Sequence, residues 1–290
     1  MTGKTLTDAV IELIRVNTST LPDDITSALH RAATDEAPGS SARAALEDIV
    51  SNIDSAKARS LALCQDTGYP TFFVRCPPAE WTSLAVPDAI RNAVRAASER
   101  SYLRPNTIST VDGRSYPDNV FANMPTIHVE PDDIFSIAML QKGGGSENVS
   151  AQISLPDMTL GAGRDSEGVF RAVMRIIVNA EGNGCAPGIL GVAIGGDRES
   201  AWHAAKMQLF RPLDDENPNT ALSELEKRIL TSANDLGIGP MGLGGKTTLL
   251  GVKLCSLARV PACYFVTVSY GCYALRRRTM TITDGGCSIA

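Results

Sequence analysis

Leu61-Ala62-Leu63-Cys64-Gln65-Asp66-Thr67-Gly68 is the segment from which the rest of the chain is best interpreted. Three apolar residues come first, then a cysteine, an amide and a carboxylate, and a glycine ends the run. An apolar lead-in is typical of a buried strand, and glycine permits a sharp backbone turn. We therefore expect a strand whose end presents Cys64, Gln65 and Asp66 at the edge of a sheet.

Two other cysteines lie beside similar glycine-rich turns. Cys185 precedes an apolar run, and Cys272 follows one. Zinc sites often use close cysteine pairs, and no Cys-x-x-Cys occurs in this sequence. Three isolated cysteines instead favour an iron–sulfur cluster in which one iron has no protein ligand. We expect Cys64, Cys185 and Cys272 to meet at one site.

The composition is that of an ordinary globular protein. The 290 residues carry a net charge of -5, with 20% charged and 43% hydrophobic residues, so nothing favours nucleic-acid binding. No apolar run is long enough for a membrane span or a secretory signal, and we expect a cytoplasmic protein. Seven scattered cysteines do not indicate a disulfide framework. Small buried hydrophobes are the predicted role of four of them: Cys76, Cys255, Cys263 and Cys287.

Hydrophobic periodicity predicts a mixed α/β (α+β) fold of β-sheets surrounded by helices. Helices are expected within residues 5–60, at 87–100 and 167–180, from about 199, and at 221–236. Strands are expected at 71–74, 126–130, 136–140, after Cys185, at 248–254 and at 264–270. With no repeat or clear linker, we expect one domain over residues 1–290, with a helical preface of about 1–60 and a cluster-binding body of about 61–290.

Two further segments carry groups suited to anion binding. Gly143, Gly144 and Gly145 have no Cβ, so their backbone amides can approach an anion or a cluster closely, although a flexible linker has the same composition. Pro105 forces the residue before it into an extended conformation, so we expect Arg104 to leave its helix and face a cleft. The run Arg276-Arg277-Arg278 is interpreted as a solvated helix end or a partner-facing edge.

Several familiar motifs fail on inspection. A P-loop needs glycine six residues before Lys246, where the sequence has Pro240, and the Gly237-x-Gly239-x-x-Gly242 run follows a predicted helix instead of a strand. Asp66-Thr67-Gly68 has no second copy, which an aspartic protease requires. The three histidines, at 30, 128 and 203, are interpreted as core or surface residues.

The ordered set of segments resembles the iron–sulfur hydro-lyases, that is, class I fumarate hydratases and the alpha subunit of L-tartrate dehydratase. The resemblance covers roughly residues 60–275. It rests on Leu-Cys64-Gln-Asp-Thr-Gly68, Tyr-Leu-Arg104-Pro, Ile-His128-Val-Glu, Lys142-Gly-Gly-Gly-Ser-Glu-Asn148, Gly-Cys185-Ala-Pro, Ile-Gly-Gly196, Leu-Gly-Ile-Gly239, Gly-Gly-Lys246 and Cys272.

This resemblance implies the N-terminal domain fold of class I fumarases and a 4Fe-4S cluster. Cys64, Cys185 and Cys272 would hold three irons, and the fourth iron would bind substrate and act as a Lewis acid. By the same resemblance the residues Gln65, Asp66, Arg104, Gly143 and Gly144 would bind substrate, and Asp66 would also be catalytic.

The expected reaction is hydration or dehydration of a small dicarboxylic hydroxy acid similar to malate or tartrate. The alternative is a non-catalytic iron–sulfur scaffold or sensor derived from the same family. A mere cluster holder has no need of Asp66, Arg104 or the three glycines, which favours the enzyme.

Two departures from the family pattern bear on substrate and partners. Val260 stands where fumarases of this class have a histidine that helps to bind substrate, so the sequence does not name the substrate. Single-chain members also continue into a second domain beyond the third cysteine. We therefore expect a separate beta subunit that completes the active site, with Arg276, Arg277 and Arg278 facing it, and a homodimer of alpha chains within a hetero-oligomer.

Overall fold

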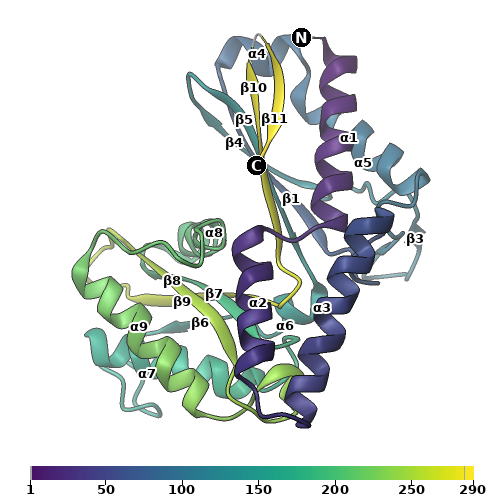
Figure 1. The fold of residues 1–290 in the computed structure, drawn as a ribbon. Helices are drawn as coiled ribbons and strands as arrows, with labels where there is room; N and C mark the ends of the chain where they lie inside the picture. Colours follow the sequence, from purple (N-terminus) through teal and green to yellow (C-terminus); the bar gives the residue numbers. More distant parts are fainter. Residues whose placement is uncertain (1, 284) are drawn as a thin grey trace. The chain divides into compact units, whose positions relative to one another are not determined.

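The structure is a computed structural model that describes residues 2–283 and 285–290, and its mixed α/β class confirms the sequence prediction. The chain divides into two compact units, which are described separately (Figure 1). Unit 1 comprises Met1–Pro22, Asn52–Gly143 and Ala274–Ala290, and unit 2 comprises Asp23–Ser51 and Gly144–Tyr273. The single domain over residues 1–290 stays a prediction.

Secondary-structure elements follow the predicted order closely. The helices are α1 (Gly3–Ser19), α2 (Asp23–Asp35), α3 (Ser41–Arg59), α4 (Pro78–Ser83), α5 (Val86–Glu99), α6 (Gly144–Asn148), α7 (Ser166–Ala180), α8 (Arg198–Gln208), α9 (Thr220–Asp235) and the 3-10 turn η1 (Pro240–Gly242). The strands are β1 (Tyr69–Cys76), β2 (Thr107–Ile108), β3 (Ser115–Tyr116), β4 (Thr126–Pro131), β5 (Phe135–Lys142), β6 (Ala151–Ser154), β7 (Gly188–Gly195), β8 (Leu249–Leu257), β9 (Phe265–Gly271), β10 (Arg276–Thr283) and β11 (Gly286–Ile289).

Unit 1 is built on a five-stranded sheet of order β11-β10-β5-β1-β4, in which only β1 and β4 pair in parallel. Helices α1 and α5 pack on it, as Figure 1 shows. Phe72 and Val74 of β1 share one core with the apolar residues of these two helices. They face the same side because successive side chains of a strand point to opposite faces of the sheet. On the other face, Phe73 stacks on His128 with ring centroids 5.0 Å apart.

Unit 2 contains a four-stranded sheet of order β6-β9-β7-β8. Helices α7 and α9 pack on one face of this sheet and form the larger hydrophobic core of unit 2 with it. Helix α8 packs on the other face through Ala201 and Ala205. Gly191 of β7 is required for this close approach, since a Cβ there would lie 2.1 Å from the Ala205 carbonyl oxygen.

The arginine run 276–278 contradicts the sequence prediction. It begins β10, which pairs on both sides with β5 and β11, instead of ending a helix. Arg276 is 1% exposed and Arg277 is 6% exposed, so neither forms a solvated or partner-facing edge in this chain. A strand position inside the sheet buries these side chains, which local charge patterning does not reveal.

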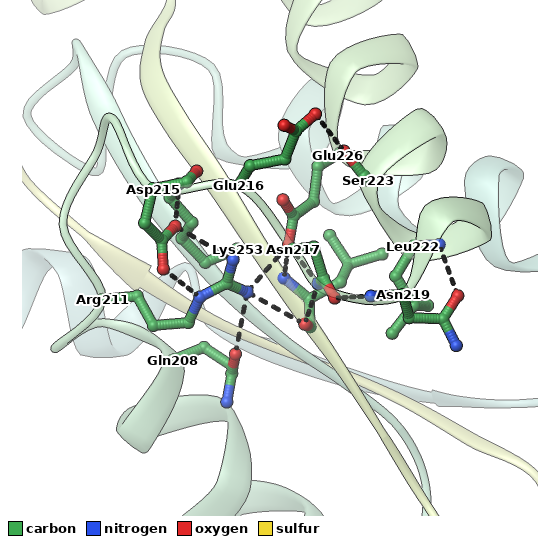
Figure 2. Close-up of polar contacts among 11 residues, drawn as sticks. Gln208, Arg211, Asp215, Glu216, Asn217, Asn219, Leu222, Ser223, Glu226 and Lys253 are labelled. Atoms are coloured by element: carbon green, nitrogen blue, oxygen red, sulfur yellow. Dashed lines mark hydrogen bonds and ion pairs between the residues drawn. The ribbon is translucent and has the colours of Figure 1, made fainter.

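An ion-pair network in unit 2 ties the segment after α8 to β8 (Figure 2). Arg211 makes two hydrogen bonds to the carboxylate of Asp215, at 2.8 and 3.0 Å, and one of 2.9 Å to Glu226. Lys253, which is 3% exposed, also donates to Asp215. Burial acts to raise the pKa of Asp215, but hydrogen bonds from Arg211 and Lys253 outweigh it and lower the pKa.

This network borders a cavity of about 280 Å³ in unit 2. The charged groups that line it are largely bound to one another, so the cluster is interpreted as structural. Within residues 2–283 and 285–290, no helix is long and apolar enough to cross a membrane.

Candidate functional site

The segment Leu61–Gly68 is not a strand, which corrects the opening prediction. Residues 61–68 are irregular, and the strand begins after them at Tyr69. Leu61 is 48% exposed and Leu63 is 3% exposed, so the apolar lead-in is buried at its last residue and exposed at its first. The backbone of Leu63 bonds instead to two helices of unit 1, with its N–H donating to Thr18 O and its carbonyl accepting from Asn52 Nδ2. Cys64 therefore follows a backbone position that is fixed from both sides.

The carbonyl oxygens after Cys64 are held by side chains from two adjacent strands of unit 1. Arg276 Nη2 donates to Asp66 O at 3.2 Å, and Gln141 Nε2 donates to Thr67 O at 2.9 Å. Arg276 on β10 and Gln141 on β5 stand opposite each other in the strand register. Two neighbouring sheet positions thus hold two consecutive peptide groups of the loop.

Gln141 is completely buried, and its side-chain oxygen also forms hydrogen bonds. It accepts from Asn17 Nδ2 at 2.8 Å and from Thr18 Oγ1 at 3.1 Å. The end of α1, strand β5 and the loop after Cys64 are therefore joined through one amide. Buried polar side chains that are satisfied in this way restrict a segment to one conformation.

The Asp66 carboxylate is oriented by its own loop. Its Oδ1 accepts the N–H of Gly68 at 2.9 Å, and a Cβ placed on Gly143 would lie 3.1 Å from Oδ2. Gly68 has φ +80°, and a Cβ there would lie 2.9 Å from the carbonyl oxygen of Lys142. Both glycines allow a close approach of backbone to the loop, and both were singled out from the sequence.

Arg104 lies beside the same loop. Its backbone N–H donates to Thr67 Oγ1 at 3.2 Å, and its guanidinium makes one long contact of 3.5 Å to Gln65 O. The residue is exposed, as is Gln65. Within unit 1, Arg104 and Gly143 thus lie beside the loop that carries Cys64, Gln65 and Asp66, and a shared role for these residues stays a prediction.

Cys185 and Cys272 lie close together along the backbone of unit 2. The β7–β9 ladder pairs Ile189 with Gly271, and beyond its end Tyr273 N donates to Cys185 O at 3.1 Å. Cys185 has φ +56°, an uncommon conformation for a residue other than glycine, and such positions concentrate at functional sites. Gly144 begins the short helix α6 of this unit.

The four cysteines that were predicted to be small buried hydrophobes match this prediction only in part. Cys76 is buried in the core of unit 1, and Cys255 and Cys263 are partly buried. Cys287 is exposed on β11, which contradicts its predicted role as a buried hydrophobe. Among the described strands, β11 is an edge strand that pairs with β10.

Three residues near these segments were missed by sequence reasoning: Gln141, Arg276 and Tyr270. Gln141 and Arg276 hold the Asp66 loop from distant parts of the chain, and Tyr270 lies next to the glycines around Cys185. The sequence marks these residues only by their proximity to other motifs. Gln141 lies just before the glycine run, and Tyr270 and Arg276 lie on either side of Cys272. No group of three His, Cys, Asp or Glu residues arranged to hold a metal is found in the described ranges.

The donors at Lys246 and Thr247 are engaged within unit 2. The backbone N–H groups of Lys246 and Thr247 donate to the buried carboxylate of Glu36 at 2.8 and 2.9 Å, and Lys246 Nζ donates to Asp35 O. These donors of unit 2 bind the chain's own acceptors. Val260 lies in the loop between β8 and β9 and is 62% exposed.

Comparison with known proteins gives a consistent set of matches. A family model described as "Fumarate hydratase (Fumerase)" matches residues 7–281. "Putative fumarate hydratase class I" of Geobacillus stearothermophilus is 39% identical over 277 residues, which are 94% of this chain and 54% of that protein. The chain therefore spans about half the length of this relative.

Two other relatives are similar to the chain over nearly their whole lengths. "Putative L(+)-tartrate dehydratase subunit alpha" of Methanocaldococcus jannaschii is 33% identical over 282 residues, covering 94% of this chain and 95% of that protein. "L(+)-tartrate dehydratase subunit alpha" of Escherichia coli strain K12 is 30% identical over 282 residues, covering 96% of this chain and 90% of that protein.

Proposed function

This chain belongs to the fumarate hydratase family of hydro-lyases, and we propose that it is the alpha-type chain of an iron–sulfur enzyme that adds or removes water at a small dicarboxylic acid. The observation that carries the proposal is the loop of unit 1 on which Cys64, Gln65 and Asp66 are consecutive, with the exposed Arg104 hydrogen-bonded to it. A thiol, a carboxylate and a cation at one loop suit an acid substrate held beside a metal.

The cysteine set fits a 4Fe-4S cluster held by Cys64, Cys185 and Cys272. Thiolates are the usual protein ligands of iron–sulfur clusters, and three of them leave one iron of four without a protein ligand. Next to two of these cysteines, the buried Tyr270 hydroxyl has no hydrogen-bond partner among the described residues, and a bound group would supply one. When bound, the cluster supplies a Lewis acid for the substrate's oxygen.

The chain's own side chains bind and orient the substrate. The planar Arg104 guanidinium pairs with a carboxylate through two hydrogen bonds, and Gln65 adds a neutral amide beside it. Asp66 has one oxygen bonded to Gly68 N–H, which fixes the plane of its carboxylate for hydrogen bonding to a hydroxyl or for holding a proton. Gly143 and Gly144 bring backbone amides close to the substrate's carboxylate.

A separate beta subunit is the proposed partner. Two relatives that match over most of their length are named subunit alpha, which supports a second kind of chain in the assembly. We extend the proposal to a homodimer of alpha chains within this hetero-oligomer, located in the cytoplasm. A non-catalytic iron–sulfur scaffold is not favoured, because the relatives are named as hydratases and dehydratases.

The first experiment tests the cluster. The chain is purified and reconstituted under anaerobic conditions, and its iron and sulfide are measured with its visible absorbance. We expect about four irons per chain, and Cys185→Ser should lose the absorbance whereas Cys287→Ser, a matched change on an exposed strand, should not. Unchanged iron in Cys185→Ser would contradict the ligand assignment.

The second experiment tests the reaction. The reconstituted chain is assayed with and without a co-expressed candidate beta chain against fumarate, malate, tartrates and mesaconate. We expect activity with one of these acids only when both chains are present. Full activity of this chain alone would refute the proposed partner, and no activity with any acid in a cluster-loaded pair would refute the substrate class.

A further inference from the structure

Tyr270 occupies an unusual position in the core of unit 2. It lies on β9 and is only 1% exposed. Its ring packs directly against the backbone of two glycines: a Cβ on Gly184 would lie 2.5 Å from the ring, and a Cβ on Gly188 would lie 2.3 Å from it. Real Cβ atoms do not come so close, so glycine at both positions is a consequence of where this ring lies.

The hydroxyl of Tyr270 is not explained by packing. It is buried, and no atom of the described residues forms a hydrogen bond with it. Most buried hydroxyls have a partner, because removing one from water without a partner costs free energy. Phenylalanine would fill the same space without this cost, so the retained hydroxyl indicates a partner other than the protein chain.

Both cluster cysteines of this unit adjoin the same ring. Gly184 and Gly188 flank Cys185, and a Cβ on Gly188 would lie 2.4 Å from the Tyr270 hydroxyl oxygen. Cys272 is two residues beyond Tyr270 and immediately follows strand β9.

We propose that the Tyr270 hydroxyl donates a hydrogen bond to a sulfur of the iron–sulfur cluster bound by Cys185 and Cys272, and that this bond raises the reduction potential of the cluster. The inference rests on the proposed function, because it requires the cluster. A hydrogen bond to sulfur stabilises the more negative, reduced form, and hydrogen bonding and burial are the means by which proteins adjust such potentials. Tyr270 is thus a positioning and tuning residue, not a catalytic one.

The test compares Tyr270→Phe with Tyr264→Phe in the full chain after anaerobic reconstitution, with its partner chain where that is needed for cluster loading. Tyr264 precedes the same strand six residues earlier, roughly 20 Å away at 3.3 Å per residue, and is partly exposed. Iron content, the electron paramagnetic resonance spectrum and the midpoint potential are measured for each. Loss of one hydrogen bond to a charged acceptor should lower the ratio of reduced to oxidised cluster about tenfold at a fixed potential.

The expected result is a lower potential and faster bleaching in air for Tyr270→Phe, with the control unchanged. A second measurement uses the cluster-free proteins: because the hydroxyl has no partner there, Tyr270→Phe should unfold at the same denaturant concentration as the parent or at a higher one. An equal potential in a fully loaded Tyr270→Phe protein would overturn this inference and leave the proposed function intact. A parent protein that binds no iron would instead refute the proposed function itself.

Discussion

The buried amide of Gln141 offers a direct test of how unit 1 holds its candidate catalytic loop. Gln141→Met keeps the length and approximate volume of the side chain but removes its polar atoms. Three hydrogen bonds disappear: one to Thr67 O at 2.9 Å, one from Asn17 at 2.8 Å and one from Thr18 at 3.1 Å. Each of these partners is buried, and each loses the bond it made with Gln141.

The expected cost follows from these three groups. A buried polar group left without its partner costs about 1–3 kcal/mol, and neighbouring losses are not fully additive, so the free energy of unfolding should fall by about 3–5 kcal/mol. For a protein of this size roughly 2–4 °C of melting temperature is lost per kcal/mol, which corresponds to a decrease of roughly 10 °C. The Asp66 loop should lose its conformation before the sheet does.

Chemical denaturation of the cluster-free chain provides the measurement. Of the two tryptophans, Trp81 belongs to unit 1 and Trp202 to unit 2, so a Trp202→Phe background makes fluorescence report on unit 1 alone. Gln152→Met is the matched control, because Gln152 is partly exposed and lies in unit 2. A loss below about 1 kcal/mol in Gln141→Met, the value of a single ordinary hydrogen bond, would refute the reasoning.

Three further predictions address charge and thiol chemistry. Arg104→Lys should lower kcat/KM by about 10- to 100-fold, because lysine cannot form the two parallel hydrogen bonds that arginine makes to a carboxylate. The denaturation midpoint should be unchanged, because Arg104 is exposed. Unaltered kinetics would show that Arg104 does not contact the substrate. Because folding lowers the pKa of Asp215, its contribution to stability is complete above the unfolded pKa of about 3.9 and is lost as the pH falls through the folded value. In Asp215→Asn the free energy of unfolding should therefore fall less steeply as the pH is lowered below about 4. Asp214→Asn, a change at an exposed neighbour, should leave this pH dependence unaltered. Burial raises the pKa of the Cys255 thiol to about 11. An alkylating reagent at pH 8 should therefore modify the exposed Cys287 well before Cys255, which mass spectrometry can follow. Equal rates of alkylation would contradict the burial of Cys255.

Local sequence patterns identified most helices and strands of this protein correctly. Helical spacing predicted α5, α7 and α9 to within a residue or two, and apolar alternation predicted β4 and β9. These patterns succeed because an amphipathic element places its core-facing residues at a fixed spacing along the chain. The cysteine–glycine segments likewise pointed to the family that the comparisons then established.

The conformation of the candidate site depended on contacts that no local pattern contains. The loop after Cys64 is irregular because its carbonyl oxygens bond to Gln141 and Arg276, which are 74 and 210 positions away along the chain. The same holds for the buried arginine strand β10 and for the ring of Tyr270 against two glycines. Residue types alone determined which groups this protein has for chemistry, whereas the tertiary structure decided which partners hold them, because hydrogen-bond partners remote in sequence meet only once the sheets have formed.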